Sequence, residues 1–166
     1  SRIGAWEVDF YPGPQGCLAM KVFGNTTFFI GYDATQGSTD MDITLMNTDW
    51  ESIEDGREYD VSVKFGDETS WDIEMTGVMY GDIPGLTIYV EADSDAARLF
   101  QREFMNELNM VWSYNGAELG DYSLKNSRRA FQSVEACQTS YRTAIESVSD
   151  PFSFNGGRNP RDPFSP

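Results

Sequence analysis

Apolar and polar residues alternate along several short segments, and this pattern constrains the fold more than any other feature. In residues 58–66 every second side chain is apolar, and polar residues fill the positions between them. Residues 71–75 repeat the pattern after the turn-like segment 66–68. Because successive side chains of a strand point to opposite faces, a period of two predicts a hairpin with one face on a core and the other in water.

Similar short segments recur through the first two-thirds of the chain, separated by Gly, Asn, Asp and Pro. They are residues 6–10, 17–23, 27–32, 40–45, 85–91 and 109–115. Two further segments, about 94–108 and 127–147, have apolar residues at helical spacing. The sequence therefore predicts an α+β fold: an antiparallel β-sandwich or partly open barrel of about eight strands, with two packed helices and a C-terminal extension.

Length and composition predict one domain followed by a tail. The chain has 166 residues, which suits a single core spanning 1–147. Residues 148–166 are rich in Pro, Gly, Asn and Ser and contain the string DPFS twice. Phe152 and Phe164 are apolar residues in these polar surroundings, so we expect them to anchor the tail on this domain or on a partner.

Negative charge is concentrated in the middle of the sequence. Residues 33–95 hold 17 acidic and 2 basic side chains, which alone account for the net charge of −15. This balance argues against nucleic acid binding, which requires basic side chains. If the strands concerned are neighbours, six carboxylates share one face, and that face is either a plain solvated surface or one that attracts salt, a cation or a basic partner. The six are Asp40, Asp42, Glu58, Asp60, Asp72 and Glu74.

Signatures of catalysis are absent from the sequence. The chain has no histidine and no phosphate-binding GxxxxGK[ST] or GxGxxG loop. Ser123 and Lys125 are two residues apart but lie beside polar residues typical of a wet turn, so we predict no catalytic residue there. Residues 40–42 and 91–96 are the best candidates for calcium, yet neither has EF-hand spacing. We expect no cofactor, with calcium as the alternative.

Cys17 and Cys137 are the two cysteines of the chain. They cannot form a zinc site alone, which leaves a disulfide or two buried thiols. A bridge closing about 120 residues would contribute nearly 5 kcal/mol in the chain-entropy model, and such bridges belong to oxidising compartments. No apolar run is long enough to span a membrane.

The two ends of the predicted domain resemble a group of small exported proteins of Gram-negative bacteria, the invasion-associated locus B-like proteins. The residues that carry this resemblance are Trp6, Gly16, Cys17, Tyr122, Ser123, Leu124, Ser127, Ala130 and Cys137. The resemblance implies a periplasmic or secreted β-sandwich-like domain, and it supports the disulfide and export. It carries over no catalytic residue.

Three functions are compatible with these observations. The leading expectation is a non-catalytic exported domain that binds a protein partner in a bacterial envelope or secreted assembly. One alternative is an acidic decoy or inhibitor that occupies a basic protein surface, in the cytoplasm if the thiols are free. The other is a carboxylate-based glycosidase or carbohydrate binder, with Trp50, Trp71 or Trp112 stacking on sugars.

Overall fold

A computed structural model describes the backbone of residues 1–149 and the side chains of residues 1–142. Ten strands and two helices follow one another along the described chain. The strands are β1 (Arg2–Ile3), β2 (Trp6–Tyr11), β3 (Gly16–Phe23), β4 (Thr26–Asp33), β5 (Asp40–Asn47), β6 (Glu58–Phe65), β7 (Trp71–Tyr80), β8 (Ile83–Glu91), β9 (Asn109–Tyr114) and β10 (Ala117–Ser123). The helices are α1 (Asp95–Asn106) and α2 (Ser127–Ser149). The predicted tail anchors, Phe152 and Phe164, lie outside the described residues.

All ten strands belong to one antiparallel sheet with the order β1-β2-β3-β4-β5-β8-β7-β6-β9-β10. The mainly antiparallel α+β architecture with two helices is therefore as predicted, whereas a sandwich or barrel of about eight strands is not confirmed. Strand β10 escaped prediction because its register shifts between Glu118 and Gly120, and such a bulge interrupts the alternation that marks a strand. Strand β1 is only two residues long.

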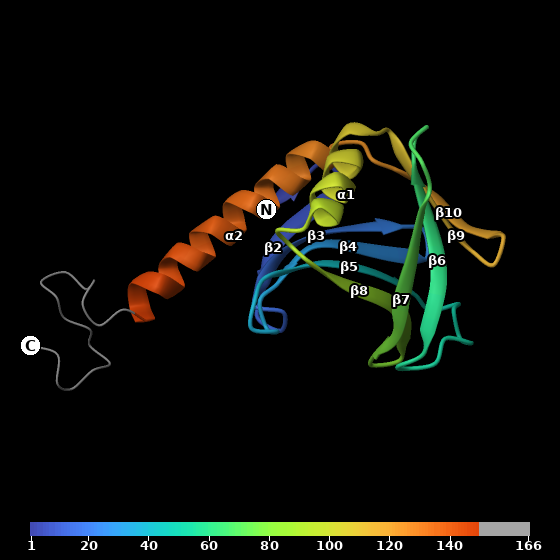
Figure 1. Cartoon of the computed structure of the whole chain (residues 1–166), viewed down its shortest axis with the longest axis horizontal. Coiled ribbons are helices and arrows are strands. Elements are labelled where there is room, and N and C mark those ends of the chain that lie inside the picture. The colour runs from blue at the N-terminus through green and yellow to red at the C-terminus, as the bar shows by residue number, and fades with distance from the viewer. Residues whose placement is uncertain (150–166) are drawn as a thin grey trace, which may run out of the picture.

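The sheet bends strongly, so that its two ends approach each other. Figure 1 shows β6 and β7 standing at a steep angle to the layer formed by β3, β4 and β5. Across the bend, Trp112 of β9 lies 6.2 Å from Phe28 of β4 between ring centroids. The Tyr122 hydroxyl of β10 donates to Thr26 Oγ1 of β4 at 2.9 Å. The space between the two ends of the sheet is therefore filled by side chains of distant strands.

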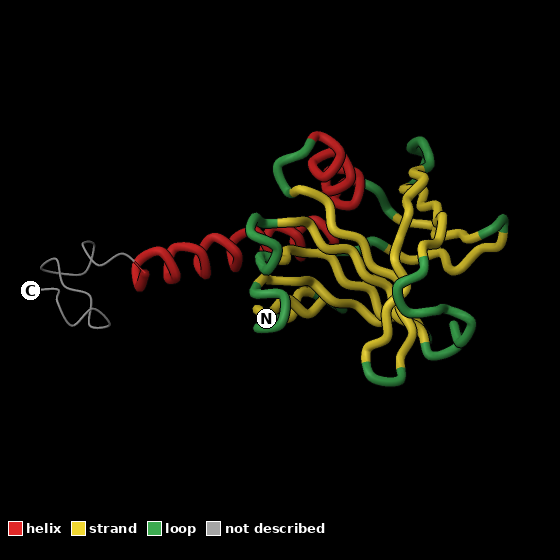
Figure 2. Tube along the Cα trace, turned by 60° about the horizontal axis from the view of Figure 1, so that its bottom comes forward, coloured by secondary structure: helices red, strands yellow, loops and turns green. Residues whose placement is uncertain are grey.

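Both helices cover the same face of the sheet, which we call the inner face (Figure 1). The Ser94 hydroxyl caps α1 by accepting from the backbone N–H of Ala97 at 3.1 Å. Helix α2 packs on β2, β3 and β4 near its start and then runs out beyond the sheet (Figure 2). The two helices join through the buried Ser127, whose hydroxyl donates to the Phe104 carbonyl at 2.7 Å.

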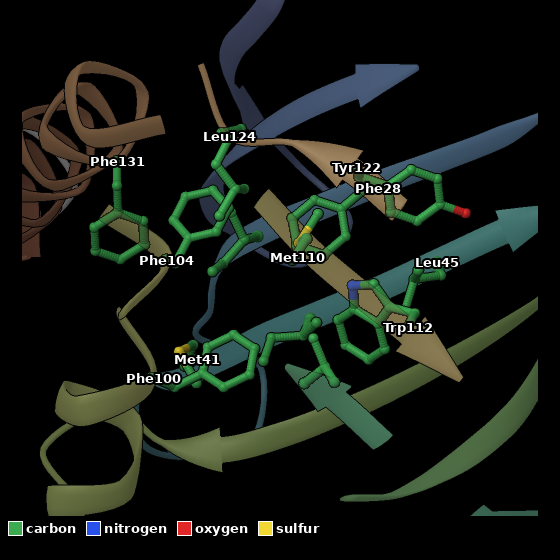
Figure 3. Packing of buried hydrophobic residues seen from close by; sticks show 14 of the residues in the cluster. Phe28, Met41, Leu45, Phe100, Phe104, Met110, Trp112, Tyr122, Leu124 and Phe131 are labelled. Atoms are coloured by element: carbon green, nitrogen blue, oxygen red, sulfur yellow. The ribbon is translucent and has the colours of Figure 1, made fainter. Parts of the chain in front are cut away.

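The core lies between the inner face and the helices and is rich in aromatic rings (Figure 3). Phe104 of α1 packs edge-on against Trp6 at 5.5 Å and stacks on Phe28 at 5.9 Å between ring centroids. Trp6 also donates its indole N–H to the Lys125 carbonyl at 2.9 Å. Edge-to-face contacts of this kind add stability beyond the area that the rings bury.

A disulfide joins Cys17 of β3 to Cys137 of α2, with the two Cα atoms 6.0 Å apart. This result confirms the predicted bridge. Beside it, the backbone N–H of Cys17 donates to Gln138 Oε1 at 2.8 Å in a buried position. The bridge and this hydrogen bond fix α2 to β3 on the inner face of the sheet.

Candidate functional site

The side of the sheet away from the helices, the outer face, carries the most distinctive site of the molecule. Along β5, Met41, Ile43 and Leu45 are buried in the core on the inner face. The alternate residues, including Asp42 and Thr44, therefore point to the outer face. On a sheet with one solvated face these alternate residues should be polar and exposed, but Asp42 and Thr44 are buried.

A groove of about 500 Å³ lies over these residues, and we call it the tyrosine groove. Asp42 and Thr44 of β5 form its floor. Tyr11 and Phe29 line one side, with their rings edge-on and 6.2 Å apart between centroids. Tyr80 of β7 and Tyr89 of β8 line the other side and are 42% and 45% exposed. The groove therefore combines a buried acidic floor with accessible aromatic walls.

Asp42 has the most unusual electrostatic environment in the groove. Its side chain is only 6% exposed, and its Oδ1 atom accepts a hydrogen bond from Thr44 Oγ1 at 2.8 Å. Burial, with a smaller contribution from the negative charge of Asp33, raises the pKa of Asp42 to about 6, although hydrogen bonds from Thr44 and Thr87 oppose the shift. Asp42 is thus ionised at neutral pH and takes up a proton in mildly acidic solution.

The phenols around Asp42 remain neutral over the same pH range. Burial and the nearby Asp42 carboxylate raise the pKa of Tyr89 to about 12. Burial is also the main cause of the raised pKa of Tyr80, with Asp42 contributing. Thr44 Oγ1 and Thr87 Oγ1 are 2.8 Å apart and form a hydroxyl pair beside the carboxylate. The groove therefore offers neutral hydroxyl groups around one ionisable acid.

Asp33 also lines the groove, but its side chain is already engaged. It is 5% exposed, and its Oδ1 atom accepts hydrogen bonds from both the backbone N–H, at 2.8 Å, and the hydroxyl of Thr35. Asp33 thus stabilises the turn that follows β4, as aspartate commonly does. Within the described chain, Asp42 instead accepts its hydrogen bonds from side-chain hydroxyl groups.

Basic side chains do not line the tyrosine groove among the residues that the structure describes. None of the ion pairs within residues 1–142 involves Asp42. On the neighbouring strand β4, Gly31 lies directly opposite Asp42, and the Leu18 side chain of β3 occupies the space beside this glycine. A Cβ atom at Gly31 would lie 2.1 Å from the Cys17 carbonyl oxygen, which makes glycine necessary there.

The six carboxylates predicted to share a face are divided by the strand order. Strand β8 lies between β5 and β7, so Asp40 and Asp42 are separated from the other four. On β6 and β7, Asp60 lies directly opposite Glu74, and both are exposed. Glu58 and Asp72 lie on the same pair of strands. These four acids form an exposed group, which we call the β6–β7 acids.

Asp40 occupies a third environment at the end of β5. It lies opposite Asp33 of β4 and opposite Glu91 of β8.

Within the described chain, no group of three or more Asp, Glu, Cys or His side chains is placed to hold a metal ion. In the second candidate calcium segment, residues 91–96, Ser94 caps α1.

The three tryptophans considered for sugar stacking lie in three different environments. Trp112 is fully buried in the core, and Trp71 donates its indole N–H to Glu103 Oε1 at 2.8 Å. Trp50 lines a separate hollow of about 300 Å³ with Tyr59 and Arg57. In that hollow the Arg57 guanidinium pairs with Glu54 at 2.8 Å and lies over the Tyr59 ring at 5.4 Å. The basic side chain that lines this hollow is therefore already paired.

Ser123 and Lys125, the nearest approach to a nucleophile and base in the sequence, are both exposed. Activation of a lysine requires burial or a neighbouring charge that lowers its pKa. Ser123 instead shapes the turn before α2, because its hydroxyl accepts from the Lys125 N–H at 3.3 Å.

The walls of the tyrosine groove were missed by sequence reasoning, although a signal was present. Phe28 and Phe29 are adjacent, and residues 83–90 are apolar or small in both phases of their alternation. A strand that is apolar on both faces is either covered by other elements on both faces or exposes apolar side chains on one of them. Tyr80 and Tyr89 carry such a surface to the outer face.

Comparison with protein-family models, with curated proteins and with solved structures finds no match, so function has to be inferred from the site itself. In the described part of the chain, neither helix combines the length and the apolar character that a membrane span requires.

Proposed function

We propose that this chain is a non-catalytic, exported interaction domain that binds a basic segment of a protein partner in the tyrosine groove. The observation that carries the proposal is the pairing of accessible aromatic walls with a buried carboxylate that has no basic neighbour among residues 1–142. Binding, unlike catalysis, needs no second reactive group, and none is placed beside Asp42 other than the engaged Asp33.

Exposed apolar side chains gather beside the groove. Tyr80 at the end of β7 is 42% exposed, and Ile83, which pairs with it, and Tyr89 of β8 are 36% and 45% exposed. Together they extend the groove wall into a wider apolar patch. Contiguous patches of this kind typically mark interaction sites, and tyrosine is enriched among the residues that dominate binding energy at protein interfaces.

Charge complementarity indicates the kind of partner. Segment 33–95, which supplies most of the groove, holds 17 acidic and 2 basic side chains. Such a field attracts basic surfaces, raises their rate of association and disfavours acidic ones. The exposed β6–β7 acids extend the same field across the outer face, so they would guide a basic segment without contacting it in the groove.

The proposed location of the domain is the periplasm or the external medium. Disulfides form and persist in oxidising compartments, and the Cys17–Cys137 bridge joins strand β3 to helix α2. In a bacterial envelope or a secreted assembly, a domain of this kind would act as an adaptor for a basic protein.

Carbohydrate binding is the second candidate, because Asp33 and Asp42 open into one groove with aromatic walls. Aromatic rings can stack on sugars, and a pair of carboxylates is the usual machinery of glycoside hydrolysis. Asp33 is committed to Thr35, which argues against a hydrolytic pair. A sugar would depend on the tyrosines but, being neutral, would respond little to ionic strength.

Backbone amide NMR of the isotope-labelled full chain tests the proposal, with deca-lysine and a neutral hexasaccharide as alternative probes. We expect deca-lysine to shift signals of the groove strands β4, β5 and β8, and to do so less at high salt. The double variant Y80S/Y89S should lose at least tenfold in affinity, whereas Tyr114→Ser, which removes an exposed tyrosine outside the groove, should not.

Two outcomes would overturn the proposal. Deca-lysine shifts confined to the β6–β7 acids would show that charge alone attracts it. Saturable shifts with the hexasaccharide alone would favour the carbohydrate candidate.

A further inference from the structure

We infer that the tyrosine groove is a lysine site: a single lysine side chain of the partner enters it and places its ammonium group against Asp42. This inference rests on the proposed function, because it names the chemical group through which the basic segment would be held. Asp42 is the anchor, and the lysine methylene chain fills the groove between the aromatic walls. The walls are the rings of Tyr11, Phe29, Tyr80 and Tyr89.

The floor of the groove lacks positive charge. Asp42 is 6% exposed and receives hydrogen bonds from neutral hydroxyl groups, and the described chain supplies no cation within ion-pair distance of it. A buried carboxylate that lacks a cationic partner is costly, and the cost is relieved by a proton or by a cation. A ligand with one positive charge therefore gains more at Asp42 than at a solvated acid.

The walls suit a long apolar stem that ends in a cation. Tyr11 and Phe29 stand on one side of Asp42 and Tyr80 and Tyr89 on the other. Aromatic faces attract an ammonium group within about 6 Å of the ring centroid. Lysine also buries its methylene groups along apolar surface while its charged end finds a polar partner. The volume of about 500 Å³ exceeds that of one such side chain and leaves space for the adjoining backbone.

The hydrogen bonding of Asp42 favours lysine over arginine. Arginine binds a carboxylate best through two parallel bonds, one to each oxygen. Here Oδ1 already accepts from Thr44, so one bond of the guanidinium fork would have to share that oxygen with the hydroxyl group. An ammonium group has three donors that rotate freely, and it can use the remaining carboxylate oxygen together with the neighbouring hydroxyl groups of Thr44 and Thr87.

The site should depend on pH because the proton competes with lysine for Asp42. Other titratable groups that face Asp42 are Asp33 from β4, Tyr80 from β7 and Tyr89 from β8, while Tyr11 lies across the groove. Burial raises the pKa of each of these three tyrosines, so the phenols do not ionise at neutral pH. With the pKa of Asp42 at about 6, affinity for lysine should rise about tenfold between roughly pH 5 and pH 7.5.

Three pentapeptides with blocked ends test the inference by NMR titration of the full chain: Gly-Gly-Lys-Gly-Gly, its Nε-acetyl-lysine form and its arginine form. We expect the lysine peptide to bind in the groove, the acetylated peptide to bind at least tenfold more weakly, and the arginine peptide several-fold more weakly. Asp42→Asn should weaken lysine binding at least tenfold and remove its pH dependence. The control Asp60→Asn, which removes an exposed acid of β6, should stay within twofold of the unchanged protein.

Equal binding of the lysine and acetyl-lysine peptides, or unchanged affinity in the Asp42→Asn variant, would overturn the lysine site. If Y80S/Y89S still abolished deca-lysine binding in that case, the proposed function would stand with a different anchor. Absence of any groove response to deca-lysine would instead overturn the proposed function itself. Amide spectra of each variant, recorded before titration, establish that the fold is retained.

Discussion

The two faces of strand β5 differ sharply, although their residues alternate along a single segment. On the inner face, Met41, Ile43 and Leu45 are at most 1% exposed and pack in an aromatic-rich core. On the outer face, Asp42 and Thr44 are nearly as well buried, yet they form the floor of an open groove. Burial on the first face stabilises the fold, whereas burial on the second face shapes a site.

The alternation of side chains along a strand therefore assigns residues to the two faces but does not determine what covers each face. On β6 and β7 the outer acids are exposed, as a solvated face requires. On β5 the outer Asp42 is enclosed by Tyr80 and Tyr89, which lie 38 and 47 residues further along the chain. If the account is right, changes on the inner face should affect stability, and changes in the groove should affect binding.

Loss of the disulfide should have the largest effect, and it acts on the inner side. The double variant C17S/C137S should lose about 5 kcal/mol of unfolding free energy, because the bridge closes a long loop in the unfolded chain. Urea unfolding of both forms measures the loss. Any protein that remains folded should bind deca-lysine as the unchanged chain does. A variant that stayed folded but lost binding would break the separation between the two faces.

The neighbouring residues Leu45 and Met46 provide a matched pair on one strand. Leu45 is fully buried on the inner face, so Leu45→Ala should cost about 2–5 kcal/mol through lost transfer energy and a cavity. Met46 lines the groove and is only partly buried, so Met46→Ala should cost less than about 1 kcal/mol but weaken deca-lysine binding several-fold. Equal stability losses for the two variants, measured by urea unfolding, would contradict the comparison.

Asp42→Asn should stabilise the free domain at pH 7.5 by about 1–2 kcal/mol. Removal of the buried charge stabilises the folded state, and the cost of burying an amide group in its place offsets part of this gain. The folded-state pKa of Asp42, about 6, exceeds the ordinary value of 3.8, so the folded state binds this proton more tightly. The unchanged protein should therefore lose stability through this group as pH rises from about 4 to about 6, and then level off.

Thermal unfolding of Asp42→Asn and the unchanged protein across this pH range measures the effect. The variant should lack the contribution of Asp42 to the slope. A variant that is less stable than the unchanged protein at pH 7.5 would show that the carboxylate is satisfied within the fold, and the argument for a cationic ligand would fail.

The smallest effect is expected among the β6–β7 acids. Asp60 lies directly opposite Glu74, and like charges facing each other across a sheet are unfavourable. Asp60→Asn should therefore stabilise the protein by a few tenths of a kcal/mol at low salt and by nothing measurable at about 1 M salt, where exposed charges are screened. A large change in unfolding free energy that persisted at high salt would show that Asp60 belongs to a site rather than to a solvated surface.

Local patterns were sufficient to predict most elements of the fold. The alternation in residues 58–65 and 71–75 corresponds to β6 and β7, and the helical spacing after Ser94 and Ser127 corresponds to α1 and α2. Cys137 lies on the helix face that packs on the sheet, where it meets Cys17. These features depend on residues close in sequence, or on the chemistry of two unique side chains.

Strand order and the groove depend on contacts that local patterns do not encode. Asp42 was predicted as one of six acids on a shared face, but β8 pairs with β5 and places Tyr89 directly beside it. Tyr80 and Tyr11 come from other strands, and nothing in their own segments indicates that they meet across Asp42. Gly31 is a further example, since the close approach that requires a glycine there is visible only once β3 and β4 are paired.

The lysine site is tested at its anchor by the pKa of the Asp42 side chain, measured by carbon-detected NMR titration in the presence and absence of the lysine pentapeptide. The account predicts a pKa of about 6 in the free protein and a lower value with the peptide, because a bound ammonium group favours the ionised carboxylate. A pKa near the ordinary aspartate value, or one that the peptide leaves unchanged, would contradict the account.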